Sequence, residues 1–146
     1  MGTFELTDKA TLENLEIVNA FLEEHLGEAG CPFKDQMQIV VVAEEIYVNI
    51  AHYAYFPETG MFTLKLEIRE DPCEAELTFI DSGMPFNPLE MEDPDITLPA
   101  EERDVGGLGI LMMKKMMDSI SYENTDGHNI LKVIKKFRKA SLDGWF

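Results

Sequence analysis

Apolar residues recur every three or four positions in the first third of the chain, and this spacing predicts two helices. The first should be capped by Thr7 or Asp8 and end by Gly30, and its apolar residues are Leu12, Leu15, Val18, Leu22 and Leu26. Pro32 suits the start of the second helix. That helix is apolar on more than one face, at Met37, Val40, Val41, Ile46, Val48 and Ile50. We therefore expect it to be central and largely buried.

Alternation of apolar and polar residues predicts strands in the rest of the chain. Residues 62–68 and 75–80 alternate on either side of an Asp71-Pro72 turn, so we expect two antiparallel neighbours with one face in water. A helix is predicted over 108–117, followed by a hairpin of 119–124 and 129–137 that turns at Asp126-Gly127. Residues 4–6 fit a short additional strand.

Helices and strands are segregated in this order, which favours an α+β fold. We expect a two-layer α/β sandwich with the helices on one face of a mixed, mainly antiparallel sheet. The 146 residues are enough for one core, so a single domain over 1–146 is expected. Residues 82–105 lack periodicity and contain four prolines and many acidic residues, including the acidic segment 90–95. We interpret this long loop as a mobile lid.

The net charge of -16 argues against direct binding to nucleic acid or to an anionic membrane, because their phosphate groups would be repelled. It does not exclude a nucleotide, since backbone N–H groups and a metal can hold phosphate locally. Cys31 and Cys73 form no metal or redox motif. The first residues lack a basic region followed by an apolar stretch, so we expect a cytoplasmic protein.

Two polar residues interrupt the apolar second helix. Glu45 and Asn49 are four residues apart and therefore share one helix face. An Asn amide oxygen suits a Mg²⁺ ion that phosphates already hold, and a carboxylate one turn earlier suits proton transfer from an attacking hydroxyl. A solvated helix edge is the alternative, and the apolar flanking residues disfavour it.

Two glycine-containing segments supply further candidates. Asp81 ends a predicted strand, where its carboxylate can accept from an amine such as adenine N6, and Gly83 would let a ring approach the backbone. An ordinary Asp-Ser-Gly turn is the alternative. Gly106, Gly107 and Gly109 lead into a helix whose free N–H groups suit a phosphate. A lid hinge without a ligand is the alternative there.

The order and spacing of these segments resemble the GHKL ATPase superfamily. Glu44 to His52 resembles its N box. Its first glycine box is matched by Asp81-Ser82-Gly83-Met84-Pro85-Phe86 and its second by Gly106-Gly107-Leu108-Gly109-Ile110. Its closing strand is matched by Asn129-Ile130-Leu131-Lys132. The small size, the Glu-x-x-x-Asn-x-x-x-x-Ala form and the Pro-Phe-Asn-Pro sequence are most similar to the anti-sigma-factor serine kinases. The resemblance covers nearly the whole chain, from Phe4 to Lys136.

The resemblance implies the Bergerat ATP-binding fold, with ATP and Mg²⁺ as cofactors. It implies that Glu45 is the catalytic base and that Asn49 is the magnesium ligand. Asp81 and Gly83 would contact adenine. The implied phosphate contacts are Gly107, Leu108 and Gly109.

Two further residues stand at positions that have a role in the family. Arg103 stands just before the second glycine box, where the family often has a basic lid residue that touches the terminal phosphate. Asn129 stands where the family has a phosphate-contacting hydroxyl on the closing strand. An amide keeps a hydrogen-bond donor there but changes its geometry.

The implied activity is that of an Mg-ATP-dependent protein serine kinase. Such kinases phosphorylate a small regulatory protein, a STAS-domain anti-anti-sigma factor, and can hold a sigma factor inactive. A homodimer is left open. A non-catalytic module that uses ATP only to capture a partner is one alternative, but it would not need a base such as Glu45. The detached ATP-binding domain of a sensor histidine kinase is another. Against it, we expect no separate dimerisation helices with a phosphoacceptor histidine before Glu45, since the only upstream histidine, His25, lies in the first predicted helix.

Overall fold

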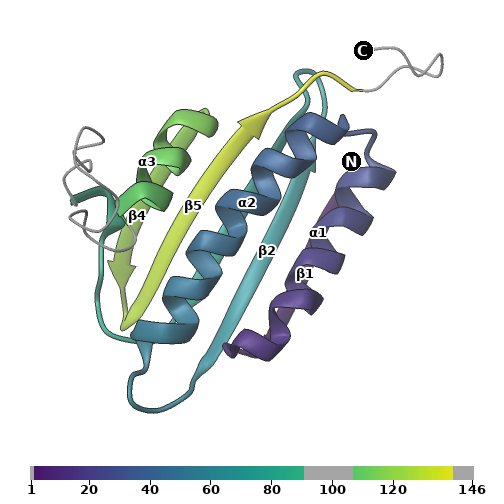
Figure 1. The fold of residues 1–146 in the computed structure, drawn as a ribbon. Helices are drawn as coiled ribbons and strands as arrows, with labels where there is room; N and C mark the ends of the chain where they lie inside the picture. Colours follow the sequence, from purple (N-terminus) through teal and green to yellow (C-terminus); the bar gives the residue numbers. More distant parts are fainter. Residues whose placement is uncertain (1, 91–106, 140–146) are drawn as a thin grey trace.

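Three helices cover one face of a five-stranded sheet in the computed structural model of the chain, which describes residues 2–90 and 107–139 (Figure 1). The strands are β1 (Gly2–Lys9), β2 (Met61–Arg69), β3 (Glu74–Asp81), β4 (Ser119–Thr125) and β5 (His128–Lys136). The helices are α1 (Leu15–Glu28), α2 (Phe33–Asn49) and α3 (Gly107–Met116). The described sheet has the order β1-β2-β3-β5-β4, and each neighbouring pair in it is antiparallel. The predicted α+β class is confirmed.

The central elements and the closing hairpin lie where the sequence predicts them. α2 follows Pro32, and β2 and β3 pair as antiparallel neighbours. The hairpin of β4 and β5 turns at Asp126 and Gly127, whose φ angles are 54° and 80°. Two consecutive left-handed residues are what a tight two-residue hairpin turn requires, which explains this Asp-Gly pair.

The beginning of the chain differs from the prediction. β1 continues to Lys9, so Thr7 and Asp8 are strand residues and not helix caps. Thr7 Oγ1 lies 2.9 Å from Thr63 Oγ1 on β2. α1 begins at Leu15, after a 3-10 turn in which Leu12 is 51% exposed. Pairing with β2 therefore overrides the capping preference of Thr7 and Asp8.

The core lies between the sheet and the helices. The inward residues of β2 and β3 are fully buried and include Phe62, Leu64, Leu66, Leu77 and Phe79. On α2, the buried Tyr47 donates its hydroxyl hydrogen to Thr11 O at 2.6 Å, in the segment just before α1. The ring of Tyr47 also meets Phe62 edge to face. These contacts fix the rotation of α2 about its axis, and with it the direction of every other α2 side chain.

Candidate functional site

The rotation of α2 decides where Glu45 and Asn49 point. Successive helix residues are rotated by about 100°, so residues two before and two after Tyr47 point roughly 200° away from it. Tyr47 faces the segment before α1, and α1 and α3 lie on opposite sides of α2 (Figure 1). Glu45 and Asn49 therefore share the flank of α2 on the α3 side, and both residues are half-buried there.

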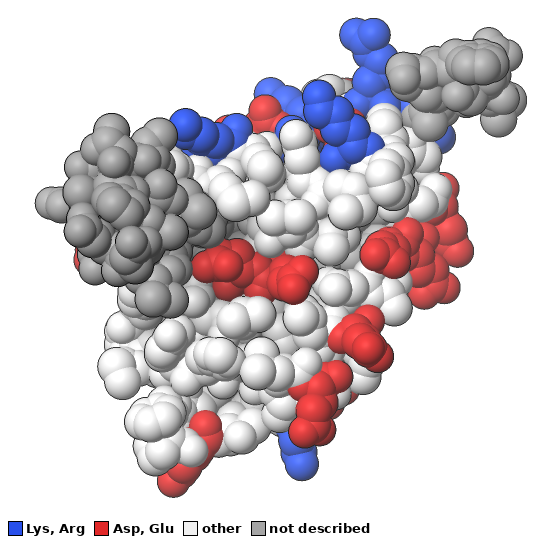
Figure 2. All heavy atoms as spheres, viewed as in Figure 1, with Lys and Arg blue, Asp and Glu red and all other residues white. Residues whose placement is uncertain are grey.

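The surroundings of Glu45 raise the proton affinity of its carboxyl group. Burial raises the pKa of the Glu45 carboxyl group above its usual value, and the neighbouring Glu44 raises it further. Acidic side chains gather over the middle of α2 on the helix-bearing face (Figure 2). A carboxylate whose pKa is moved toward neutrality is a better proton acceptor at physiological pH.

The end of α2 is tied to the segment that follows β3. α2 continues as a π-helix, Ile50–Ala54, and Ala54 O accepts a hydrogen bond from Met84 N at 2.7 Å. A Cβ atom at Gly83 would lie 2.3 Å from Ala54 O, so the backbone contact leaves room only for glycine. Packing inside the protein thus accounts for Gly83 without a ligand ring.

Asp81 is the last residue of β3, and hydrogen bonds from the described residues engage one of its two carboxylate oxygens. The residue is 7% exposed. Its Oδ1 accepts hydrogen bonds from Gly83 N and from Asn129 Nδ2, each at 2.9 Å. Among residues 2–90 and 107–139, no hydrogen bond reaches its Oδ2. A remaining oxygen that only accepts is suited to an amine donor such as adenine N6.

Asn129 holds this carboxylate and the following loop in place. It pairs with Asp81 across β3 and β5 and is 6% exposed. Its Nδ2 also donates to Met84 O at 3.1 Å. Its Oδ1 accepts from the Tyr122 hydroxyl and from Asn124 Nδ2, both on β4. The structure therefore places Asn129 beside the Asp81 carboxylate, at the end of the site that is predicted to hold the adenine ring.

The sequence alone does not point to Tyr122, Asn124 or Tyr55. The predicted turn at Asp126-Gly127 does set Asn124 opposite Asn129, so the hairpin register carries a signal for that pair. Tyr55 carries none. Its hydroxyl donates to Met61 O at 2.6 Å and accepts from Ser82 N at 2.7 Å, which links the segment after α2 to the start of β2 and to the residue that follows β3.

α3 begins at Gly107, so Gly107, Leu108 and Gly109 form its first turn. The first N–H groups of a helix have no partner within the helix and suit an anion. Arg103, Gly106 and residues 91–95 of the acidic segment lie outside the described residues. The predicted lid is described only as far as residue 90, where Pro88–Glu90 form a 3-10 turn.

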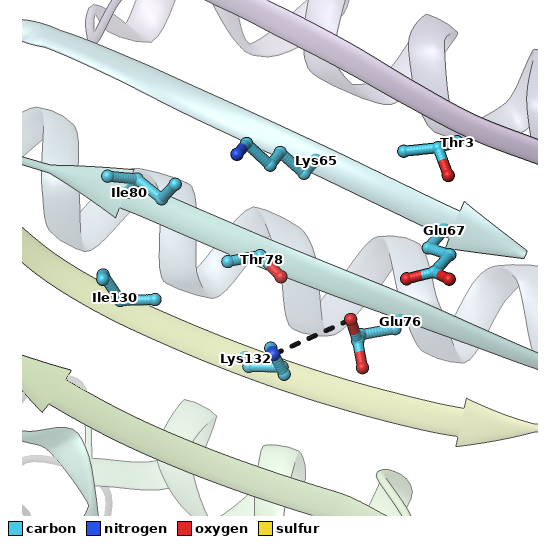
Figure 3. A pocket seen from close by; sticks show the side chains of 8 residues that line it. All are labelled: Thr3, Lys65, Glu67, Glu76, Thr78, Ile80, Ile130 and Lys132. Carbon is cyan, nitrogen blue, oxygen red and sulfur yellow. Dashed lines mark ion pairs between the residues drawn. The ribbon is translucent and has the colours of Figure 1, made fainter.

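Two hollows on the described surface lie away from these residues. One of about 310 Å³ lies on the sheet face opposite the helices and is lined by residues that include Lys65, Thr78 and Lys132 (Figure 3). The other, of about 560 Å³, is lined mainly by residues just after β1 and just before β2, among them Thr11, Asn14, Thr59 and Gly60. The described residues contain no cluster of three His, Cys, Asp or Glu side chains suited to a metal ion. A magnesium ion at Asn49 would therefore take most of its ligands from phosphate and water.

Most of the chain matches a known protein family. Residues 9–135 match the family described as histidine kinase-like ATPase domain. The chain is 27% identical over 93 residues to the serine/threonine-protein kinase BtrW of Bordetella bronchiseptica, which covers 64% of this chain and 65% of BtrW. It is 24% identical over 145 residues to the serine-protein kinase RsbW of Halalkalibacterium halodurans, which covers 97% of this chain and 87% of RsbW. The alignment thus spans slightly less than two thirds of BtrW.

Solved structures share the fold. A structure of RsbU and RsbW domains from Mycobacterium tuberculosis gives a TM-score of 0.68 at 18% identity, over 94% of this chain and 33% of that chain. The SiaB-SiaC complex from Pseudomonas aeruginosa gives a TM-score of 0.57 at 17% identity, over 90% of this chain and 89% of that chain. At these identities the likeness establishes the fold alone. Within the described residues, no helix is long and apolar enough to cross a bilayer.

Proposed function

The chain belongs to the histidine kinase-like ATPase family and is distantly related to the serine kinases RsbW and BtrW, and from this premise we propose that it is an Mg-ATP-dependent protein serine kinase. Family membership implies the use of ATP. The serine would lie on a small regulatory protein of the STAS-domain, anti-anti-sigma type, and a sigma factor would be a second partner. The observation that carries the proposal is that Glu45 and Asn49, one helical turn apart on α2, are both half-buried, and that burial raises the pKa of Glu45.

The binding roles follow from the contacts around Asp81. Asp81 Oδ2, which no hydrogen bond from the described residues reaches, would accept from adenine N6, while the Asn129 amide and Gly83 N–H hold Oδ1. The first turn of α3 would receive phosphate oxygens at its free N–H groups. Asn49 would supply one oxygen to a magnesium ion, which neutralises charge on the transferring phosphate.

The chemical role falls to Glu45. A serine hydroxyl of the partner attacks the terminal phosphorus of ATP, a new P–O bond forms to serine, and the bond to ADP breaks. Glu45 takes the hydroxyl proton, and its raised pKa suits this step. Non-catalytic binding of a nucleotide would have no use for a carboxylate with a raised pKa at this position.

The experiment incubates the purified chain with Mg-ATP and a STAS-domain protein from the same genome, followed by mass spectrometry of the partner. We expect one serine to gain a phosphate, and only when both ATP and Mg²⁺ are present. If the partner binds in an ATP-dependent manner but never gains phosphate, the chain is a non-catalytic, ATP-gated binding module and not a kinase. Phosphate on a histidine would point to the histidine-kinase alternative.

A further inference from the structure

Basic residues concentrate at the end of the molecule that lies farthest from Asp81. The chain has 12 Lys and Arg residues against 28 Asp and Glu residues. Seven of the basic residues lie where α2 begins, α3 ends and β5 ends: Lys34, Lys114, Lys115, Lys135, Lys136, Arg138 and Lys139. We call these seven residues the basic end. Figure 2 shows Lys and Arg side chains along the corresponding upper edge.

Specific contacts hold the basic end together. Lys135 Nζ donates to Met116 O at 3.0 Å, which joins the end of β5 to the end of α3. The Lys139 side chain packs against Gly30, just before α2, so closely that a Cβ atom there would lie 2.9 Å from Lys139 Cγ. Three segments that are far apart in the sequence therefore present one basic surface.

Helix stability explains only part of this surface. Lys114 and Lys115 lie in the last turn of α3, where positive charge is favourable to the helix dipole. Lys34 lies in the first turn of α2, where positive charge is unfavourable. Among the described residues, no ion pair engages Lys34, Lys136 or Arg138, and all three are exposed. Clustered unpaired cations cost stability by mutual repulsion, so a function is the better explanation.

An apolar ridge begins beside Lys34. Phe33 is 76% exposed and Met37, one turn later, is 43% exposed. Val41 is half-buried and Glu45 follows after another turn, so the four residues lie along one i to i+4 ridge of α2. An aromatic side chain exposed to this extent beside cations is a common anchor of protein interfaces. The ridge leads from the basic end to the proposed catalytic base.

We propose that the basic end, with Phe33 as its apolar anchor, is a docking surface for a protein partner that presents acidic side chains around an apolar residue. Opposite charge would steer such a partner to the basic end, because the chain as a whole carries a net charge of -16. The step from docking to catalysis rests on the proposed kinase function. A partner seated along the ridge would bring its hydroxyl toward Glu45, about 18 Å along the helix from Phe33.

A nucleic acid is the other polyanion that a basic surface suggests, and two observations disfavour it. The net charge of -16 repels a long polyanion beyond the patch itself. The ridge at Phe33 and Met37 is apolar, whereas a nucleic-acid backbone presents phosphate and sugar. An acidic protein surface with an apolar residue is complementary both to the positive charge of the basic end and to the apolar ridge.

The test measures binding of the full chain to fluorescent probes by anisotropy. The probes are a helical peptide with a leucine ridge flanked by glutamates, the same peptide with lysines, and single- and double-stranded oligonucleotides. We expect the glutamate peptide to bind best and to weaken as salt rises. The triple variant Lys34→Glu, Lys115→Glu, Arg138→Glu should weaken binding at least about tenfold, and Phe33→Ala about tenfold.

The matched control is Lys9→Glu with Lys65→Glu, which reverses exposed lysines on the sheet and should leave peptide binding unchanged. Glutamine in place of the three glutamates serves as a milder variant, and circular dichroism checks the fold. ATP affinity should be the same in the parent and in all these variants. A parent chain that does not bind ATP would count against the proposed kinase function and not against the docking surface. Equal binding of both peptides, or an unaffected triple variant, would overturn the docking surface. If the chain binds an oligonucleotide more tightly than the glutamate peptide, the basic end is a nucleic-acid-binding surface and the proposal is wrong.

Discussion

Asn129 Nδ2 donates a hydrogen bond to Asp81 Oδ1 at 2.9 Å, between two side chains that are almost fully buried at the ends of neighbouring strands. The Asn129 amide is itself oriented, because its Oδ1 accepts from Tyr122 and Asn124. This chain of donors determines which oxygen of Asp81 stays available. These hydrogen bonds make Asn129 a positioning residue for the adenine-binding end of the site.

Replacing Asn129 by Asp should disturb that end specifically. The variant keeps the size of the side chain but removes the donor and sets two carboxyl groups side by side, so ATP affinity should fall at least about tenfold. Calorimetric titration with ATP measures it. Glu123→Gln, on the same strand as Tyr122 but exposed, is the control and should bind ATP like the parent. Unchanged affinity in Asn129→Asp would remove the positioning role.

The base preference should depend on the charge of Asp81. Its carboxylate accepts from the amine of adenine but repels the carbonyl oxygen that guanine presents at the same position. Asp81→Asn should lower ATP affinity at least about tenfold and narrow the preference over GTP. Competition between ATP and GTP for a fluorescent nucleotide measures both quantities. Equal affinity of the parent for the two nucleotides would contradict the assignment.

Gly83 and Gly27 provide a matched pair of glycines. A methyl group at Gly83 would meet Ala54 O at 2.3 Å, so Gly83→Ala should lower the free energy of unfolding by about 1–3 kcal/mol. Gly27 lies within α1 with nothing within 4 Å of such a methyl group, so Gly27→Ala should raise it by up to about 1 kcal/mol. Urea unfolding measures both. Equal effects would mean that the Ala54 contact is absent in solution.

The raised pKa of Glu45 makes the stability of the fold depend on pH. Because the folded protein binds the Glu45 proton more tightly than the unfolded chain does, the ionised carboxylate destabilises the fold at neutral pH. Glu45→Gln should therefore be more stable than the parent at pH 7. The difference should shrink as pH falls through the raised pKa and vanish below about pH 4.3, the ordinary glutamate value. Urea midpoints at several pH values measure it, and a variant less stable than the parent at pH 7 would contradict it.

How much of the structure follows from the sequence depends on how local each feature is. The positions of α2, β2 and β3 follow from apolar spacing within each segment, and the Asp126-Gly127 turn follows from its own backbone requirement. The extent of β1 does not. Thr7 and Asp8 are good caps in isolation, and only their pairing with β2, more than fifty residues later, makes them strand residues.

The candidate site divides in the same way. Glu45 and Asn49 share a helix face by their spacing alone, so the pair is visible in the sequence. The contact of Asn129 with Asp81 needs β5 to lie beside β3, although α3 and β4 come between them in the chain. The close approach of Gly83 to Ala54 likewise depends on how the end of α2 meets the segment after β3. Long-range packing of this kind leaves no mark in local periodicity.

The most direct test of the kinase proposal compares Glu45→Gln and Asn49→Ala with the parent, in nucleotide affinity with and without Mg²⁺ and in single-turnover phosphorylation of the partner. Glu45→Gln keeps size and hydrogen bonding but cannot take the proton. We expect phosphotransfer to fall by roughly 10²–10⁴-fold while ATP affinity barely changes. Asn49→Ala should lose the magnesium-dependent part of nucleotide binding. Full activity in Glu45→Gln, together with parental Mg-ATP binding in Asn49→Ala, would contradict the proposal and leave the two residues as a solvated edge of α2.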